Sequence, residues 1–108
     1  MDIEDVKKAI VEVETGDAVL IDVRTDEERS DGYAKPALHF NSKRMEAGEL
    51  PEGLDKNKSI YLYCRGGGRA GRMKTLLISK GFENVHNLGG YLDWKEAGGE
   101  VVNPPSEK

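Results

Sequence analysis

The sequence predicts an α/β domain with a central, mostly parallel sheet and helices on both of its faces. Helical patterns and short apolar runs alternate along the chain, as expected of strands joined by crossover helices. Two of the runs, at residues 18–23 and 59–63, are almost wholly apolar, which is typical of strands covered on both faces. The length of 108 residues fits a single domain over residues 1–108, with its core at about 6–102 and a frayed polar tail at 103–108.

The first half of the chain opens with a helix at residues 2–14, whose apolar residues recur at helical spacing and whose first turn is acidic. The apolar run at 18–23 is the first strand. Thr25 then has the features of a helix N-cap with Glu28 as its capping-box partner, so a short helix is expected at 27–30. Weaker patterns predict a strand at 37–40, a helix at 42–47 and a surface loop at 50–58.

The second half of the chain begins with the strand at 59–63, which runs into a helical pattern. Because ligands of parallel α/β sheets bind outside the carboxyl ends of the strands, the end of this strand is the expected site. The remaining elements, separated by glycines, are a helix at 69–80 ended by Gly81, a short strand at 84–88, a turn at Gly89 and Gly90, and a last helix at 91–97.

The charge pattern favours an anionic ligand over nucleic acid. The net charge is −4, yet residues 64–80 contain five Arg or Lys and no acid, so this segment carries +5 and the other residues −9. A basic island beside Cys64 raises the local concentration of anions. A positive segment this short, without interleaved aromatic residues and in an acidic chain, is not typical of a nucleic-acid-binding protein.

Composition and cysteine usage lead us to expect a cytoplasmic protein. No apolar run approaches the roughly 20 residues that span a bilayer, so no membrane partner is expected. Residues 1–5 lack the basic and then apolar pattern of a signal peptide. One cysteine cannot form an internal disulfide, so nothing demands an oxidising compartment. A periplasmic protein whose leader had been removed would have the same features.

Cys64, the only cysteine, is the most informative residue because it joins a strand to a glycine-rich turn. The three glycines that follow allow successive backbone N–H groups to point at one anionic atom. A helix N-terminus and nearby arginines lower the pKa of a thiol below its free value of about 8.5. We therefore expect Cys64 to be a catalytic nucleophile, and we expect the residues after it to bind a small anion: Arg65, Gly66, Gly67, Gly68 and Arg69.

Other polar residues are better explained by structure than by catalysis. Asp22 and Arg24 flank the end of the first strand, and Arg24 could pair with Glu28, since buried charges need partners. His39 and His86 do not have metal-site spacing, and one cysteine does not make a zinc set. The glycine loop and helix dipole can activate the thiol without a histidine base. No metal or other cofactor is expected.

Three segments resemble the rhodanese family of single-domain sulfurtransferases. Residues 21–28 (Ile-Asp-Val-Arg-Thr-Asp-Glu-Glu) are similar to its early strand-and-turn signature, and residues 63–70 (Tyr-Cys-Arg-Gly-Gly-Gly-Arg-Ala) to its active-site loop. Residues 82–94 resemble its closing strand-turn-helix, which ends in Trp94. The three motifs occur in the family's order, which makes the resemblance far more specific than the glycine loop alone.

The resemblance implies a rhodanese-type thiosulfate sulfurtransferase. In that reading Cys64 takes up a sulfane sulfur as a persulfide and passes it to an acceptor, the loop at 65–69 cradles the outer sulfur, and Arg69 faces the anionic donor. The implied partners are a small anionic sulfur donor such as thiosulfate and an acceptor that is cyanide, a thiol or a thioredoxin-like protein. We expect a monomer that needs no cofactor.

Two departures from the family's usual pattern bear on donor preference. Residues 32–37 read Gly-Tyr-Ala-Lys-Pro-Ala where the family usually has Gly-His-Ile-Pro-Gly-Ala, which predicts a different turn with Lys35 near the mouth of the pocket. Ala70 replaces the serine or threonine that commonly closes the loop, so one hydroxyl donor to a bound anion is missing.

Two alternative functions use the same cysteine. A cysteine-dependent phosphatase or arsenate reductase is one, but such phosphatases have a Cys-x5-Arg loop, whereas only four residues separate Cys64 from Arg69. The tighter loop suits a single sulfur atom better than a phosphate, and the chain has no second cysteine for a reductase relay. A non-catalytic persulfide carrier or partner-binding module is the other alternative, and it needs the same loaded cysteine.

Overall fold

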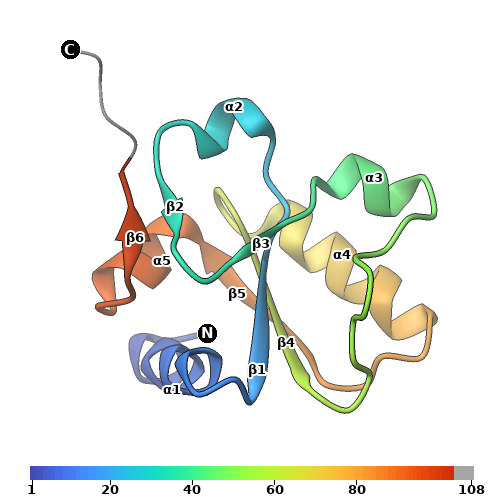
Figure 1. The fold of residues 1–108 in the computed structure, drawn as a ribbon, viewed down its shortest axis with the longest axis horizontal. Helices are drawn as coiled ribbons and strands as arrows, with labels where there is room; N and C mark the ends of the chain where they lie inside the picture. Colours follow the sequence, from blue (N-terminus) through green and yellow to red (C-terminus); the bar gives the residue numbers. More distant parts are fainter. Residues whose placement is uncertain (104–108) are drawn as a thin grey trace.

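A four-stranded parallel sheet forms the centre of the molecule (Figure 1). The computed structural model describes residues 1–103, so all of the predicted frayed tail except Asn103 lies outside the described residues. The three neighbouring strand pairs are all parallel, which confirms the predicted fold class. In spatial order the strands are β3 (Leu38–His39), β1 (Ala18–Asp22), β4 (Ser59–Cys64) and β5 (Val85–Gly90).

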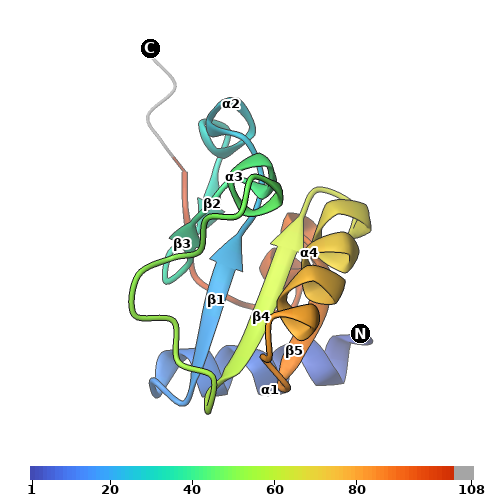
Figure 2. The same cartoon turned by 90° about the vertical axis from the view of Figure 1, so that its right-hand side faces the viewer.

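Helices cover both faces of this sheet, and Figure 2 shows α1 and α4 on opposite sides of the strands. One face is covered by α1 (Ile3–Glu14) and α5 (Tyr91–Glu96), and the other by α3 (Ser42–Glu46) and α4 (Gly68–Ser79). The observed bounds lie within one residue of the predicted ones for α1, α3, α4 and α5. Within the described part of the chain, no helix is long and apolar enough to span a membrane.

Strand β4 connects the two layers of the core because its side chains alternate between the faces of the sheet. Tyr61 and Tyr63 pack in the layer of α1 and α5, around the fully buried Trp94. Leu62 and Cys64 point the other way and pack with α3 and α4. The last residue of the strand therefore reaches the edge of the sheet directly beneath the start of α4.

A capping box fixes the short helix α2 (Asp26–Arg29) just beyond the carboxyl end of β1, as predicted. The Thr25 hydroxyl accepts a hydrogen bond from the Glu28 backbone N–H at 3.1 Å, and Glu28 Oε1 accepts one from the Thr25 N–H at 3.1 Å. The Glu28 side chain is thus held at a defined position beside the end of the parallel sheet.

Two features differ from the sequence prediction. The strands β2 (Tyr33–Ala34) and β6 (Val101–Val102) form a separate antiparallel pair, which the sequence could not reveal because each strand has only two residues. The predicted turn at Gly89 and Gly90 is wrong, since both residues belong to β5 and lie opposite Tyr63 and Cys64. A register shift at Leu62 and Tyr63 lets the strand continue through the two glycines, and α5 follows without an intervening turn.

Candidate active site

Cys64 lies at the carboxyl end of β4, where the chain enters the glycine loop and then α4. The turn depends on Gly67, the N-cap of α4, whose φ of 97° is in the left-handed region that favours glycine. The helix begins one residue later, at Gly68, so the thiol lies next to the positive end of a twelve-residue helix. The cysteine is only 1% exposed.

Backbone N–H groups of the loop point at the Cys64 sulfur. The Gly67 N–H donates a hydrogen bond to Sγ at 3.0 Å. Burial raises the pKa of the Cys64 thiol, but the N–H groups of Ala70, Gly67, Gly66 and Arg69 together lower it by more, so the pKa lies below its usual range. The anionic form of the sulfur is therefore stabilised relative to that of a free cysteine. Ala70 lies one position beyond the predicted anion-binding loop at residues 65–69.

Strand β5 supports the loop from beneath. Asn87 Nδ2 donates a hydrogen bond to the Gly67 carbonyl at 2.9 Å, and Asn87 Oδ1 accepts one from the Gly89 N–H at 2.9 Å. At Gly90, a Cβ atom would collide with the carbonyl oxygen of Arg65. Asn87 has no local sequence signal for this role, because only the pairing of β4 with β5 brings it beneath the loop.

Arg69 makes a bidentate ion pair with Glu28. The Nη1 and Nη2 atoms of Arg69 lie 2.6 and 2.7 Å from Oε1 and Oε2 of Glu28. The pair is about three-quarters buried, and the hydrogen bonds from Arg69 are the main reason that the pKa of Glu28 falls from 4.5 to about 2. Glu28 in turn raises the pKa of Arg69, with a smaller contribution from Cys64. The arginine that was expected to face a donor thus already has an anionic partner.

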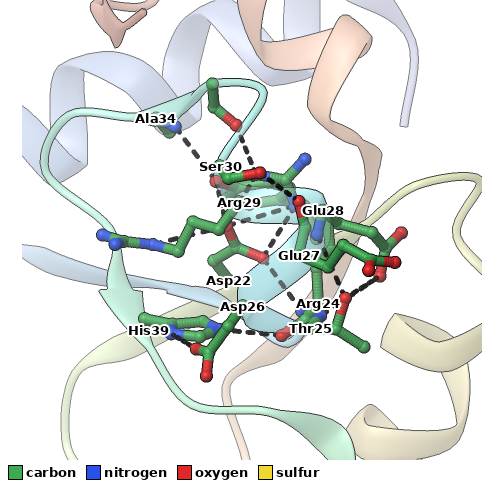
Figure 3. Close-up of polar contacts among 12 residues, drawn as sticks. Asp22, Arg24, Thr25, Asp26, Glu27, Glu28, Arg29, Ser30, Ala34 and His39 are labelled. Carbon is green, nitrogen blue, oxygen red and sulfur yellow. Dashed lines mark hydrogen bonds and ion pairs between the residues drawn. The ribbon is translucent and has the colours of Figure 1, made fainter. Parts of the chain in front are cut away.

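A second ion pair, between Asp22 and Arg24, is buried (Figure 3). Arg24 Nε and Nη2 donate to the Asp22 carboxylate at 3.0 and 2.9 Å, and Nη2 also donates to the Gly32 carbonyl at 2.7 Å. The Tyr63 hydroxyl donates to Asp22 Oδ2 at 2.8 Å and accepts from the Ala34 N–H at 3.0 Å. These contacts agree with the prediction that Asp22 and Arg24 have a structural role.

The suggested pairing of Arg24 with Glu28 is wrong. Asp22 is two residues away on the same strand end and fully buried, whereas Glu28 is held by Thr25 and Arg69. The expected place of Lys35 also differs, because its Nζ lies 3.5 Å from Glu100 and it does not line the cavity described below.

A cavity of about 380 Å³ opens beside the loop. Its wall contains both positively and negatively charged side chains. Among the described residues, Arg65 is exposed on this wall and has no ion-pair partner. No group of three His, Cys, Asp or Glu side chains within residues 1–103 is arranged to hold a metal ion. The wall consists of Arg24, Glu28, Asp31, Arg65, Tyr91 and Leu92.

Comparison with known families agrees with this geometry. The profile of a family described as "Rhodanese-like domain" matches residues 4–97. The chain belongs to this family. The rhodanese-like match covers the sheet, the Cys64 loop and the elements that hold it, so the resemblance noted in the sequence is confirmed.

Rhodanese-like relatives include named sulfurtransferases. A sulfurtransferase of Allochromatium vinosum is 33% identical over 84% of this chain and 84% of its own length. The thiosulfate sulfurtransferase GlpE of Coxiella burnetii is 31% identical over 77% of each chain. A tRNA uridine(34) hydroxylase of Acaryochloris marina is 39% identical, but this chain spans only 27% of its length. The crystal structure of the Alr3790 protein from Anabaena superposes with a TM-score of 0.77 at 26% identity, over 93% of this chain and 80% of that one.

Proposed function

We propose that this rhodanese-like sulfurtransferase moves a sulfane sulfur from thiosulfate or a similar donor to a thiol or cyanide through a persulfide on Cys64. The Cys64 thiolate attacks the outer sulfur of thiosulfate. The sulfur–sulfur bond of the donor breaks, and sulfite leaves with the electron pair. The acceptor then attacks the outer sulfur of the persulfide, which releases thiocyanate or a new persulfide and restores the thiolate.

The observation that carries this proposal is the set of backbone N–H groups around the Cys64 sulfur. They favour the thiolate before the reaction, and after it they can stabilise the negative charge of the terminal sulfur, much as an oxyanion hole stabilises oxygen. The amides belong to the turn between a strand end and a helix start, so the fold already directs them at the sulfur before charge arrives. Similarity to a named thiosulfate sulfurtransferase supports the choice of donor.

The phosphatase and arsenate reductase alternatives are less well supported. Arg69, the arginine that would bind a tetrahedral oxyanion, is engaged by Glu28 at 2.6 and 2.7 Å. The chain has a single cysteine, so a reductase relay would have no resolving thiol. A cysteine that must return to the thiolate after each transfer suits a reducing compartment, and we propose the cytoplasm as the place of action.

Intact-mass measurement tests the proposal. After incubation with thiosulfate we expect the protein to gain the mass of one sulfur atom, and cyanide should remove it with release of thiocyanate. Cys64→Ser protein should show neither event. Absence of the adduct under non-reducing conditions would rule out thiosulfate as the donor. Sustained turnover with small acceptors would distinguish the enzyme from a persulfide carrier that reacts only with a partner protein.

A further inference from the structure

The charges around the Cys64 loop largely cancel in the folded protein. The sequence places a net charge of +5 on residues 64–80, which suggests a strongly cationic site. In the structure, however, Arg69 is paired with Glu28 and Arg24 with Asp22. Arg65 is the cation of the cavity wall that has no ion-pair partner within residues 1–103, and the charge of Asp31 on the same wall offsets it. The charges on the wall of this cavity, beside the Cys64 loop, are therefore nearly balanced.

Glu28 is held in this position by contacts other than those to Arg69. Its Oε1 accepts hydrogen bonds from the Thr25 backbone N–H at 3.1 Å and from the Thr25 hydroxyl at 3.2 Å. Its own backbone N–H is bound by the Thr25 hydroxyl. The carboxylate cannot leave without breaking the capping box of α2, so a donor anion has to compete with a fixed negative charge for Arg69.

We propose that Glu28 is a specificity-determining residue that disfavours doubly charged donors and favours donors that carry no charged group beyond the reacting sulfur, such as an alkyl persulfide. The inference rests on the sulfurtransferase activity proposed above. Thiosulfate must bring its sulfonate end close to Arg69 and hence close to the Glu28 carboxylate. An alkyl persulfide has no sulfonate group that must lie close to the Glu28 carboxylate.

The transfer from an alkyl persulfide is balanced without a co-reactant. The Cys64 thiolate attacks the terminal sulfur of RSSH, the sulfur–sulfur bond breaks, and the thiol RSH leaves with the proton. The persulfide anion remains on Cys64, within reach of the loop N–H groups. This step needs no contact from Arg69 beyond the one it already makes with Cys64, so the pairing of Arg69 with Glu28 does not hinder it.

Glu28→Gln separates the charge of Glu28 from its structural role. Glutamine also serves at the third position of a capping box, so the helix start is preserved while the negative charge is removed. We expect KM for thiosulfate to fall about tenfold with little change in kcat, because Arg69 becomes available to the donor. For the persulfide of 2-mercaptoethanol we expect a change in KM of less than about twofold, the size of a weak solvent-exposed charge effect.

Two further variants control the experiment. Glu49→Gln removes the same charge and breaks another Arg–Glu pair, to Arg44, outside the cavity wall, and it should leave both KM values unchanged. In the double variant Glu28→Gln with Arg69→Gln, the gain toward thiosulfate should disappear. An unchanged preference in Glu28→Gln, or a gain that persists without Arg69, would overturn the inference.

A binding measurement decides the inference even if no sulfur is transferred. In Cys64→Ser protein, titration calorimetry should show thiosulfate binding about tenfold more tightly when Glu28 is also replaced by Gln. If wild-type protein forms no persulfide with either donor, the proposed function fails, while the calorimetric comparison still tests the role of Glu28. Equal thiosulfate affinities in the two proteins would refute that role.

Discussion

The two terminal nitrogens of Arg69 lie 2.6 and 2.7 Å from the two carboxylate oxygens of Glu28. This contact joins the first turn of α4, which together with the loop before it carries the amides around Cys64, to the short helix α2 after β1. Because the same carboxylate completes the capping box of α2, a single side chain positions a helix and also sets the charge next to the thiol.

The lowered pKa of Cys64 predicts the pH dependence of its reactivity. Since the thiolate is the nucleophile, the alkylation rate with iodoacetamide should rise with pH and reach half its maximum at a lower pH than the rate of an unperturbed cysteine thiol. The rate should be measured from pH 5 to 10 beside a small-molecule thiol. A midpoint equal to that of the free thiol would show that the loop amides do not stabilise the anion.

Gly67→Ala should weaken the site through the backbone. A residue with a Cβ atom at φ 97° is strained by about 1–2 kcal/mol, so the loop should shift and the N–H hydrogen bond to Cys64 should lengthen. We expect a higher thiol pKa, slower persulfide formation and a lower unfolding free energy. Gly66→Ala is the matched comparison, because its φ is not in the left-handed region and a Cβ there meets nothing within 4 Å. Its losses should be clearly smaller than those of Gly67→Ala, and equal losses would argue against backbone strain.

Asp22→Asn should destabilise the fold strongly. The substitution leaves the Arg24 guanidinium, which is 6% exposed, without its anionic partner, and removing one member of a buried pair costs about 3–5 kcal/mol. Urea denaturation should show a lower midpoint with an unchanged slope. Lys7→Gln, which breaks an exposed pair with Glu4, should change the unfolding free energy by less than about 0.5 kcal/mol.

The pKa of Glu28 predicts how its contribution to stability depends on pH. Arg69 lowers this pKa in the folded protein to about 2, from an ordinary value of 4.5. A carboxylate with a lowered folded pKa stabilises the protein above the unfolded value, and this contribution is lost as pH falls toward the folded value. The difference in unfolding free energy between wild type and Glu28→Gln should therefore be constant above about pH 5 and should shrink between pH 4.5 and 2. A difference that does not change with pH would show that the ion pair contributes nothing to stability.

The elements that could be predicted from the sequence are those that depend on neighbouring residues in the chain. The long helices have regular apolar spacing, β1 and β4 are continuous apolar runs, and the capping box of Thr25 and Glu28 spans only three residues. The place of Cys64 at the end of a strand, before a glycine loop and a helix, could be predicted for the same reason.

The remaining features depend on contacts between distant parts of the chain. Strands of two residues, such as β2 and β6, have no detectable period, and their pairing joins segments nearly seventy positions apart. Asn87 reaches the Cys64 loop only through the register of β5 with β4. Glu28 pairs with Arg69 and not with Arg24, because α2 lies beside the start of α4. No local sequence pattern encodes the relative position of these two helices.

Trp94 and Cys64 give the protein two intrinsic probes, one in each layer of its core. The single tryptophan is fully buried in the layer of α1 and α5, and its indole N–H donates a hydrogen bond to the Glu100 carbonyl at 2.8 Å. The single cysteine is buried on the other side of the sheet, beside α4. Fluorescence therefore reports on one half of the fold and thiol labelling on the other, without any introduced dye or mutation. Coincident transitions would establish that the two halves unfold together, whereas earlier labelling of the thiol would show that the half containing Cys64 opens while the half containing Trp94 remains folded.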